Sequence, residues 1–140
     1  MKKKELRKGT GKVYLTVQYD EENSWLYANW VGFMTMDMIK QGGLMLIEAV
    51  RESKCKHMLN DNREVEGTWA KANEWIATEW GPKIMDAGLR NFAMILSSNI
   101  FSEMSAKDLE TKQDSFTMRS FVDIEDAKKW LKEQSVAIGS

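Results

Sequence analysis

The sequence is poor in the residues that build disulfides, metal centres and nucleophilic active sites. Its 140 residues include one cysteine, one histidine and one proline. A lone cysteine excludes an internal disulfide and the multi-thiol metal sites, and this usage is typical of a reducing compartment such as the cytoplasm. The sequence also contains no G-x-S-x-G, P-loop or G-x-G-x-x-G motif. We therefore expect no metal, no cofactor and no enzymatic activity.

An excess of charge of one sign and long apolar runs are also missing. The 20 basic and 21 acidic side chains nearly cancel, so no overall field draws the chain to nucleic acid or to an anionic membrane. No run approaches the ~20 apolar residues of a membrane-spanning helix. The stretch from Met1 to Leu6 lacks the apolar segment of a secretory signal. These absences predict a soluble, cytoplasmic protein.

The length of the chain fits one domain. A chain of 140 residues that is 43% hydrophobic can bury about two thirds of its unfolded surface, which is enough for a core. We expect a frayed basic arm over residues 1–12, a single domain over residues 13–134 and a tail over residues 135–140. The arm has no interleaved aromatic residues, so a role in binding nucleic acid is not expected.

Apolar and polar residues alternate from Val13 and predict a strand, and an aromatic-rich strand follows from Trp25 to Val31. The polar turn at residues 20–23 predicts that these two strands form an antiparallel hairpin. Thr35 can cap a helix that runs to about Arg51. Gly42-Gly43 weakens this helix, which suggests that it packs closely against the sheet at that point.

After residue 54, short apolar strands alternate with helices. Because such connections cross over, the later strands are expected to run parallel. The predicted class is therefore a single-domain α/β fold, with one mixed sheet built from an N-terminal antiparallel hairpin and following βα repeats. The predicted strands are residues 55–59, 91–96 and 115–121. Three helices are predicted between and after them. The first starts near Thr68 and is interrupted at Gly81-Pro82, the second starts at Ser102 or Ser105, and the third starts at Asp123.

Four segments carry a further signal, namely Asn60-Asp61-Asn62-Arg63, Trp69 to Trp80, Ala87 to Ala93 and Phe121 to Leu131. In this order they resemble the STAS-like domains, specifically the SpoIIAA-like branch, over nearly the whole chain. The resemblance implies a non-enzymatic regulatory or protein-interaction domain. In that family, anti-sigma-factor antagonists carry a phosphorylatable serine in an Asp-Ser-(Ser/Thr)-Gly motif after the central strand. Here Glu66-Gly67-Thr68-Trp69 takes its place, so Thr68 is the nearest hydroxyl.

The segment from Asn60 to Thr68 is the predicted contact site. We expect a polar loop at the C-terminal end of the central strand, with the free amides of a helix start behind it. The alternative is an ordinary polar turn with an Asx motif and a helix cap. A calcium loop is not expected, because its glycine and glutamate are out of register. The candidate binding residues are Asn60, Asp61, Asn62, Arg63, Thr68 and Trp69.

Cys55 and His57 lie two residues apart and so point to the same side of their strand. Neighbours along one strand stand side by side, and a buried thiol is inert, so we assign them no catalytic role.

Six tryptophans and ten methionines are unusual, and many of them fall between Trp25 and Met38. They fit an ordinary core, a self-association surface, or a small apolar pocket. A homodimer formed through the aromatic strand or the first helix is therefore one expectation, because rings on both faces of that strand would need a cover. A small hydrophobic-ligand or lipid-binding module is the alternative function.

Overall fold

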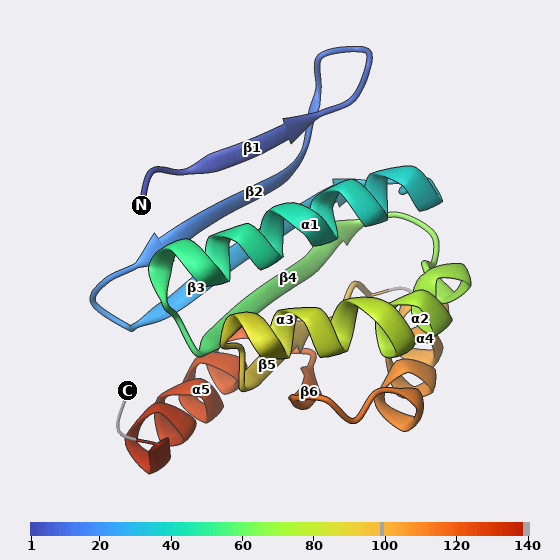
Figure 1. The fold of residues 1–140 in the computed structure, drawn as a ribbon. Coiled ribbons are helices and arrows are strands. Elements are labelled where there is room, and N and C mark those ends of the chain that lie inside the picture. Colours follow the sequence, from blue (N-terminus) through green and yellow to red (C-terminus); the bar gives the residue numbers. More distant parts are fainter. Residues whose placement is uncertain (99, 139–140) are drawn as a thin grey trace.

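The computed structural model describes residues 1–98 and 100–138, and it arranges their strands in one six-stranded sheet (Figure 1). The strands lie side by side in chain order. Strand β2 runs antiparallel to its two neighbours β1 and β3, and β3 to β6 run parallel. The predicted mixed sheet, with a hairpin followed by parallel strands, is confirmed. The strands are β1 (Lys4–Arg7), β2 (Val13–Asp20), β3 (Trp25–Gly32), β4 (His57–Val65), β5 (Asn91–Ile95) and β6 (Thr117–Phe121).

Helices cover both faces of this sheet. Figure 1 shows α1 and α3 lying across the same face, while α5 packs on β5, β4 and β6. A large apolar cluster lies on the α1 side and a smaller one, which contains Trp130, lies under α5. The helical elements are α1 (Met36–Ser53), the 3-10 turn η1 (Ala70–Ala72), α2 (Asn73–Trp75), the π-helical turn η2 (Ile76–Trp80), α3 (Gly81–Ala87), α4 (Ile100–Lys112) and α5 (Ile124–Ile138).

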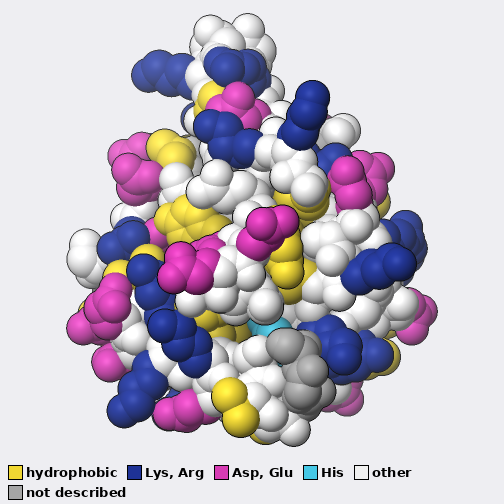
Figure 2. Space-filling view, turned by 90° about the vertical axis from the view of Figure 1, so that its left-hand side faces the viewer, with side chains coloured by type: hydrophobic (Ala, Val, Ile, Leu, Met, Phe, Trp, Pro, Cys, Tyr) yellow, Lys and Arg dark blue, Asp and Glu magenta, His cyan; other side chains and the backbone are white. Residues whose placement is uncertain are grey.

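The aromatic strand β3 lies inside the sheet, between β2 and β4. Trp25 and Trp30 belong to the clusters on opposite faces, and each is 2% exposed. The prediction that these rings need a second chain to cover them is therefore wrong, because the helices of the same chain cover both. On the side shown in Figure 2, charges of both signs separate the hydrophobic side chains into small patches. Self-association itself stays a prediction.

Helix ends follow the predicted signals. Thr35 Oγ1 accepts a hydrogen bond of 3.2 Å from the amide of Met38 at the start of α1. Gly88, with φ of 131°, ends α3. Asp123 Oδ1 accepts 2.8 Å from the amide of Glu125 at the start of α5. The signal at α4 differs, because this helix already begins at Ile100, so Ser102 and Ser105 lie within it and do not cap it.

The segment between β4 and β5 is irregular, as Gly81-Pro82 predicted. It passes without a break from a 3-10 turn into a short α-helix, then a π-helical turn, and then α3. The amide of Gly81 donates to the carbonyl of Ile76, the i→i−5 pattern of a π turn, and Pro82 stands at the start of α3. A proline there is tolerated because the first amides of a helix have no partner within the helix.

The two ends of the chain are more ordered than the sequence predicted. Lys4–Arg7 forms the edge strand β1, in which Leu6 packs against the core and Lys4 Nζ lies 3.0 Å from Glu52 Oε2. The expected frayed arm is therefore a strand over these residues. Helix α5 continues to Ile138, beyond the boundary expected at residue 134, and residues 139–140 lie outside the described part. A four-residue strand with three charges gives no periodic signal, but it suits an exposed sheet edge.

Gly42 and Gly43 let α1 approach the tryptophans. A Cβ on Gly42 would lie 2.3 Å from the Trp30 ring and 2.9 Å from Leu15, and one on Gly43 would lie 2.9 Å from the Trp80 ring. The Trp80 Nε1 also donates to the carbonyl of Gly43 at 2.8 Å. Close packing at this pair, predicted from the sequence, is confirmed.

Gly42→Ala is expected to destabilise the protein by about 1–3 kcal/mol, because the clash with Trp30 outweighs the ~1 kcal/mol gain in helix propensity. Urea unfolding followed by circular dichroism measures the free energy of unfolding. Gln41→Ala, at the exposed neighbouring position, is the control and should leave this free energy within about 0.5 kcal/mol of wild type. A Gly42→Ala variant as stable as wild type would contradict the packing.

Candidate functional site

Strand β4 runs to Val65, six residues further than predicted, and this changes the nature of the candidate site. Asn60 and Asp61 pair with β3 on one side and with β5 on the other. Asn60, Asp61 and Asn62 are buried. The prediction of a polar loop from Asn60 is therefore wrong, since these residues form the inner end of the central strand.

The Asn60 carboxamide lies on the α1 face of the sheet and is bonded within the chain. Its Oδ1 accepts 2.9 Å from Trp30 Nε1, and its Nδ2 donates 3.0 Å to Asn62 Oδ1. The side chain is buried, so the bonds replace those it would make with water. The polar atoms of the Asn60 side chain are therefore engaged within the chain.

Asp61 points to the opposite face and holds together a second polar group. Its Oδ2 accepts 2.6 Å from the Tyr27 hydroxyl and 2.7 Å from Arg63 Nη2, while Oδ1 accepts 3.0 Å from Arg63 Nε. The Asp61 side chain is 3% exposed, whereas the Arg63 side chain is 49% exposed. Among the predicted site residues, Arg63 thus reaches solvent while its partner does not.

The two acids of this group shift in opposite directions. Burial alone would raise the pKa of Asp61, but hydrogen bonds from Arg63 and Tyr27 hold that pKa below its usual value. Burial, together with the hydrogen bond to Asp61, raises the pKa of Tyr27 to about 12. At neutral pH, therefore, Asp61 is a carboxylate and Tyr27 is a neutral donor.

Apart from Arg63, the exposed part of the predicted site lies after β4. Thr68 lies on the surface, and its Oγ1 accepts 3.1 Å from the amide of Ala70. Trp69 is buried, with its ring edge-on to Trp30 at 5.5 Å. The helical segment opens with a three-residue 3-10 turn that has no side-chain cap. The amides of Ala70 and Ala72 donate to Thr68 Oγ1 and to the Trp69 carbonyl, so the row of free amides predicted behind the loop is not found at η1.

Phe33 belongs to this surface, although sequence reasoning did not single it out as a site residue. Its ring is 65% exposed and packs on Gly67, where a Cβ would lie 3.0 Å from Phe33 Cε1. Gly67 has φ of 75°, and the amide of Glu66 donates 3.1 Å to the carbonyl of Gly32. The loops after β3 and β4 are therefore in contact. The sequence signal for Phe33 is an aromatic residue directly after an apolar strand and a glycine. This signal does not reveal the contact with Gly67, because Gly67 is distant in the sequence.

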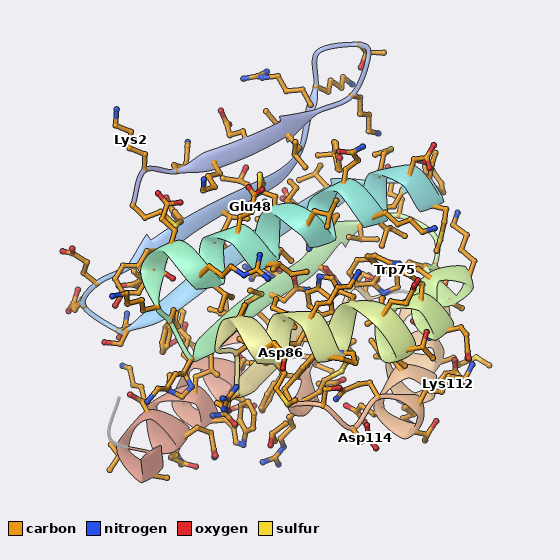
Figure 3. The ribbon with its side chains drawn as sticks, in the orientation of Figure 1. Lys2, Glu48, Trp75, Asp86, Lys112 and Asp114 are labelled. Atoms are coloured by element: carbon orange, nitrogen blue, oxygen red, sulfur yellow. The ribbon has the colours of Figure 1, made fainter. Side chains whose placement is uncertain are left out.

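The tryptophan-rich region lines a small cavity between α1, the sheet and the α2–α3 segment. Its volume is about 30 Å³. Trp75 lies between α1 and this segment (Figure 3), and a Cβ on Gly43 would lie 3.0 Å from its ring. The wall is apolar apart from Asn60, which is already bonded. Its aromatic members are Trp30, Trp69, Trp75, Trp80, Phe92 and Phe116.

Cys55 and His57 do not form a nucleophile and base pair. The Cys55 thiol donates to the carbonyl oxygens of His57 at 3.1 Å and Ser24 at 3.4 Å, and burial raises its pKa. The His57 Nδ1 lies 3.3 Å from Asn91 Nδ2, and burial lowers the pKa of the imidazole. Within residues 1–98 and 100–138, no three His, Cys, Asp or Glu side chains gather in a way that could hold a metal ion. In the same part of the chain, no helix is long and apolar enough to cross a membrane.

Comparison with known proteins places this arrangement in a fold class. A solved structure of an uncharacterised DUF3478-family protein from Shewanella loihica PV-4, described with a SpoIIAA-like fold, superposes with a TM-score of 0.57. The two chains share 21% sequence identity, over 84% of this chain and 91% of the other. Searches against family models and curated proteins gave no match. The chain thus has a SpoIIAA-like α/β fold, as its resemblance to the STAS-like domains implied.

The Tyr27 hydroxyl gives a test of the second polar group. A folded pKa of about 12 lies above the unfolded value of about 10. The stabilisation from neutral Tyr27 is therefore fully present below pH 10 and is lost as the pH rises from 10 to 12. The phenolate absorbance of wild type minus that of Tyr27→Phe reports this single group.

We expect this difference titration to have its midpoint near pH 12, and Asp61→Asn to move it towards pH 10. A midpoint already near pH 10 in the wild type would contradict the Tyr27–Asp61 contact.

Proposed function

We propose that this chain is a non-enzymatic regulatory domain that binds a partner protein through the surface formed by Phe33, Gly67 and Thr68. The observation that carries the proposal is the 65% exposed Phe33 ring, which packs on Gly67 beside the exposed Thr68. Aromatic side chains are enriched in protein interfaces. This surface also lies at the C-terminal ends of parallel strands, where open α/β folds usually bind.

A rigid support under the surface favours recognition of a folded partner. The bond from Trp30 to Asn60 joins β3 to β4 below the two loops, and the bond from Asn60 to Asn62 fixes the Asn60 side chain within β4. Preformed surfaces lose less conformational entropy on binding. In this proposal Thr68 contacts the partner and Arg63 contributes its exposed guanidinium. The buried predicted residues act as support, namely Asn60, Asp61, Asn62 and Trp69.

The arrangement of polar groups fits a binding role better than a catalytic one. Asp61 has both oxygens engaged by Tyr27 and Arg63, and the Cys55 thiol is buried and donates to carbonyl groups. The pKa of Tyr27 is raised to about 12, so its hydroxyl stays protonated at neutral pH and is a poor general acid or base there. A buried thiol also fits a reducing location, and we place the protein in the cytoplasm.

The alternative function, a small hydrophobic-ligand or lipid-binding module, has one place in the structure, the aromatic cavity. Its ~30 Å³ is about a tenth of the smallest ordinary ligand pockets, which start near 300 Å³. Native mass spectrometry of the freshly purified chain distinguishes this alternative, since it requires a bound small-molecule mass.

Photocrosslinking tests the protein-binding proposal. A benzoylphenylalanine replaces Thr68 in the cell that makes the protein, and in a control it replaces Lys129, an exposed residue of α5. We expect a discrete adduct of protein mass from position 68 that is absent from position 129 and is reduced at least about fivefold by Phe33→Ala. Equal adducts from both positions, or none from position 68, would contradict the proposal.

A further inference from the structure

A second feature adjoins Phe33, an open groove of about 500 Å³ between the β1–β2 hairpin and the start of α1. The hairpin tip projects from the top of the molecule with Lys and Arg side chains around it (Figure 2). Lys8 and Phe33 both line the groove, so we name it the Lys8–Phe33 groove. The question is which partner chemistry fits it.

Lys8 is the distinctive charge of this groove. The residue is half-buried, and its Nζ lies 3.2 Å from the position of a Cβ on Gly32. Within the described part of the chain, Lys8 makes no ion pair. Arg7, in contrast, is engaged, with Nη1 donating 2.8 Å to the carbonyl of Gly11 and Nη2 lying 3.6 Å from Glu5 Oε1. The Lys8 ammonium group therefore has no carboxylate partner among the described residues, and a carboxylate can pair with it.

The remaining wall of the groove is largely apolar. Phe33 stands exposed, Met38 is half-buried, and the buried Tyr14 ring has its hydroxyl 3.4 Å from the Met38 carbonyl. Asp37, in the first turn of α1, is the one carboxylate in the lining. It repels a second negative charge, so the groove suits a single carboxylate next to apolar groups. A nucleic acid or an anionic membrane would bring many.

We propose that the Lys8–Phe33 groove receives an extended segment of the partner protein, with an Asp or Glu carboxylate on Lys8 and an apolar side chain against Phe33. The inference rests on the proposed function and names the partner chemistry for the groove that adjoins the proposed surface through Phe33. The groove volume accommodates a few side chains of an extended segment. The charges are complementary, because one ammonium meets one carboxylate and the ring meets apolar surface.

Selection from a random dodecapeptide phage library on the immobilised protein tests this inference. The wild type is expected to enrich peptides that carry Asp or Glu within three residues of an aromatic or aliphatic residue. Lys8→Glu should weaken binding of these selected peptides at least about tenfold and shift its own selection to Lys and Arg. Lys12→Glu is the matched control, since it makes the same charge change on the same hairpin outside the groove lining. It should bind as the wild type does.

Enrichment without acidic residues, no enrichment at all, or equal binding by Lys8→Glu and wild type would overturn the inference. The Thr68 crosslink separates this failure from failure of the proposed function. A crosslink that persists in Lys8→Glu, with no acidic preference in the selection, leaves the protein-binding role and removes the groove. A mass that falls from dimer to monomer on Lys8→Glu in sedimentation equilibrium would identify the occupant as a second copy of this chain, and this too would overturn the inference.

Discussion

The hydrogen bond from Trp30 Nε1 to Asn60 Oδ1 is the contact on which the candidate site depends. It joins the two central strands β3 and β4 inside the core, where an unpaired polar group would cost about 1–3 kcal/mol. The same indole ring packs against α1 at Gly42 and meets the Trp69 ring at 5.5 Å. One side chain therefore connects β3, β4, α1 and the start of η1.

Hydrogen bonds within the chain explain how the polar residues Asn60, Asp61 and Asn62 can form part of the buried strand β4. Asn60 is satisfied by Trp30 and Asn62 on one face, and Asp61 by Tyr27 and Arg63 on the other. Because these bonds are made inside the chain, β4 extends to Val65 and places the following loop against Phe33. The position of the proposed contact surface is thus set by polar groups that are buried in the chain.

Local signals were sufficient for much of the fold. The order of strands and helices follows from apolar periodicity, and the caps at Thr35, Gly88 and Asp123 follow from side-chain chemistry within a few residues. The Gly42-Gly43 pair also predicted the close packing of its helix, which the structure shows against Trp30 and Trp80. The length of β4 was not predictable in this way. Its Asn-Asp-Asn sequence is typical of a turn. It forms a strand here because Asn60 and Asp61 bond to Trp30 and Tyr27, which lie 30 and 34 residues away in the sequence. The Lys8–Phe33 groove depends on the same kind of distant contact, between a hairpin tip and the end of β3.

The central claim is that Asn60, Asp61 and Asn62, predicted to lie in a loop, belong to the interior of the domain, whereas Thr68 lies on its surface. Residue-resolved amide hydrogen exchange in the native state measures this directly. The account predicts that the amides of Asn60 and Asp61 exchange as slowly as those of Met58 and Leu59, and that the amide of Thr68 exchanges many times faster. Exchange of Asn60 and Asp61 at the rate of Thr68 would contradict it, because these residues would then form the surface loop that their sequence suggests.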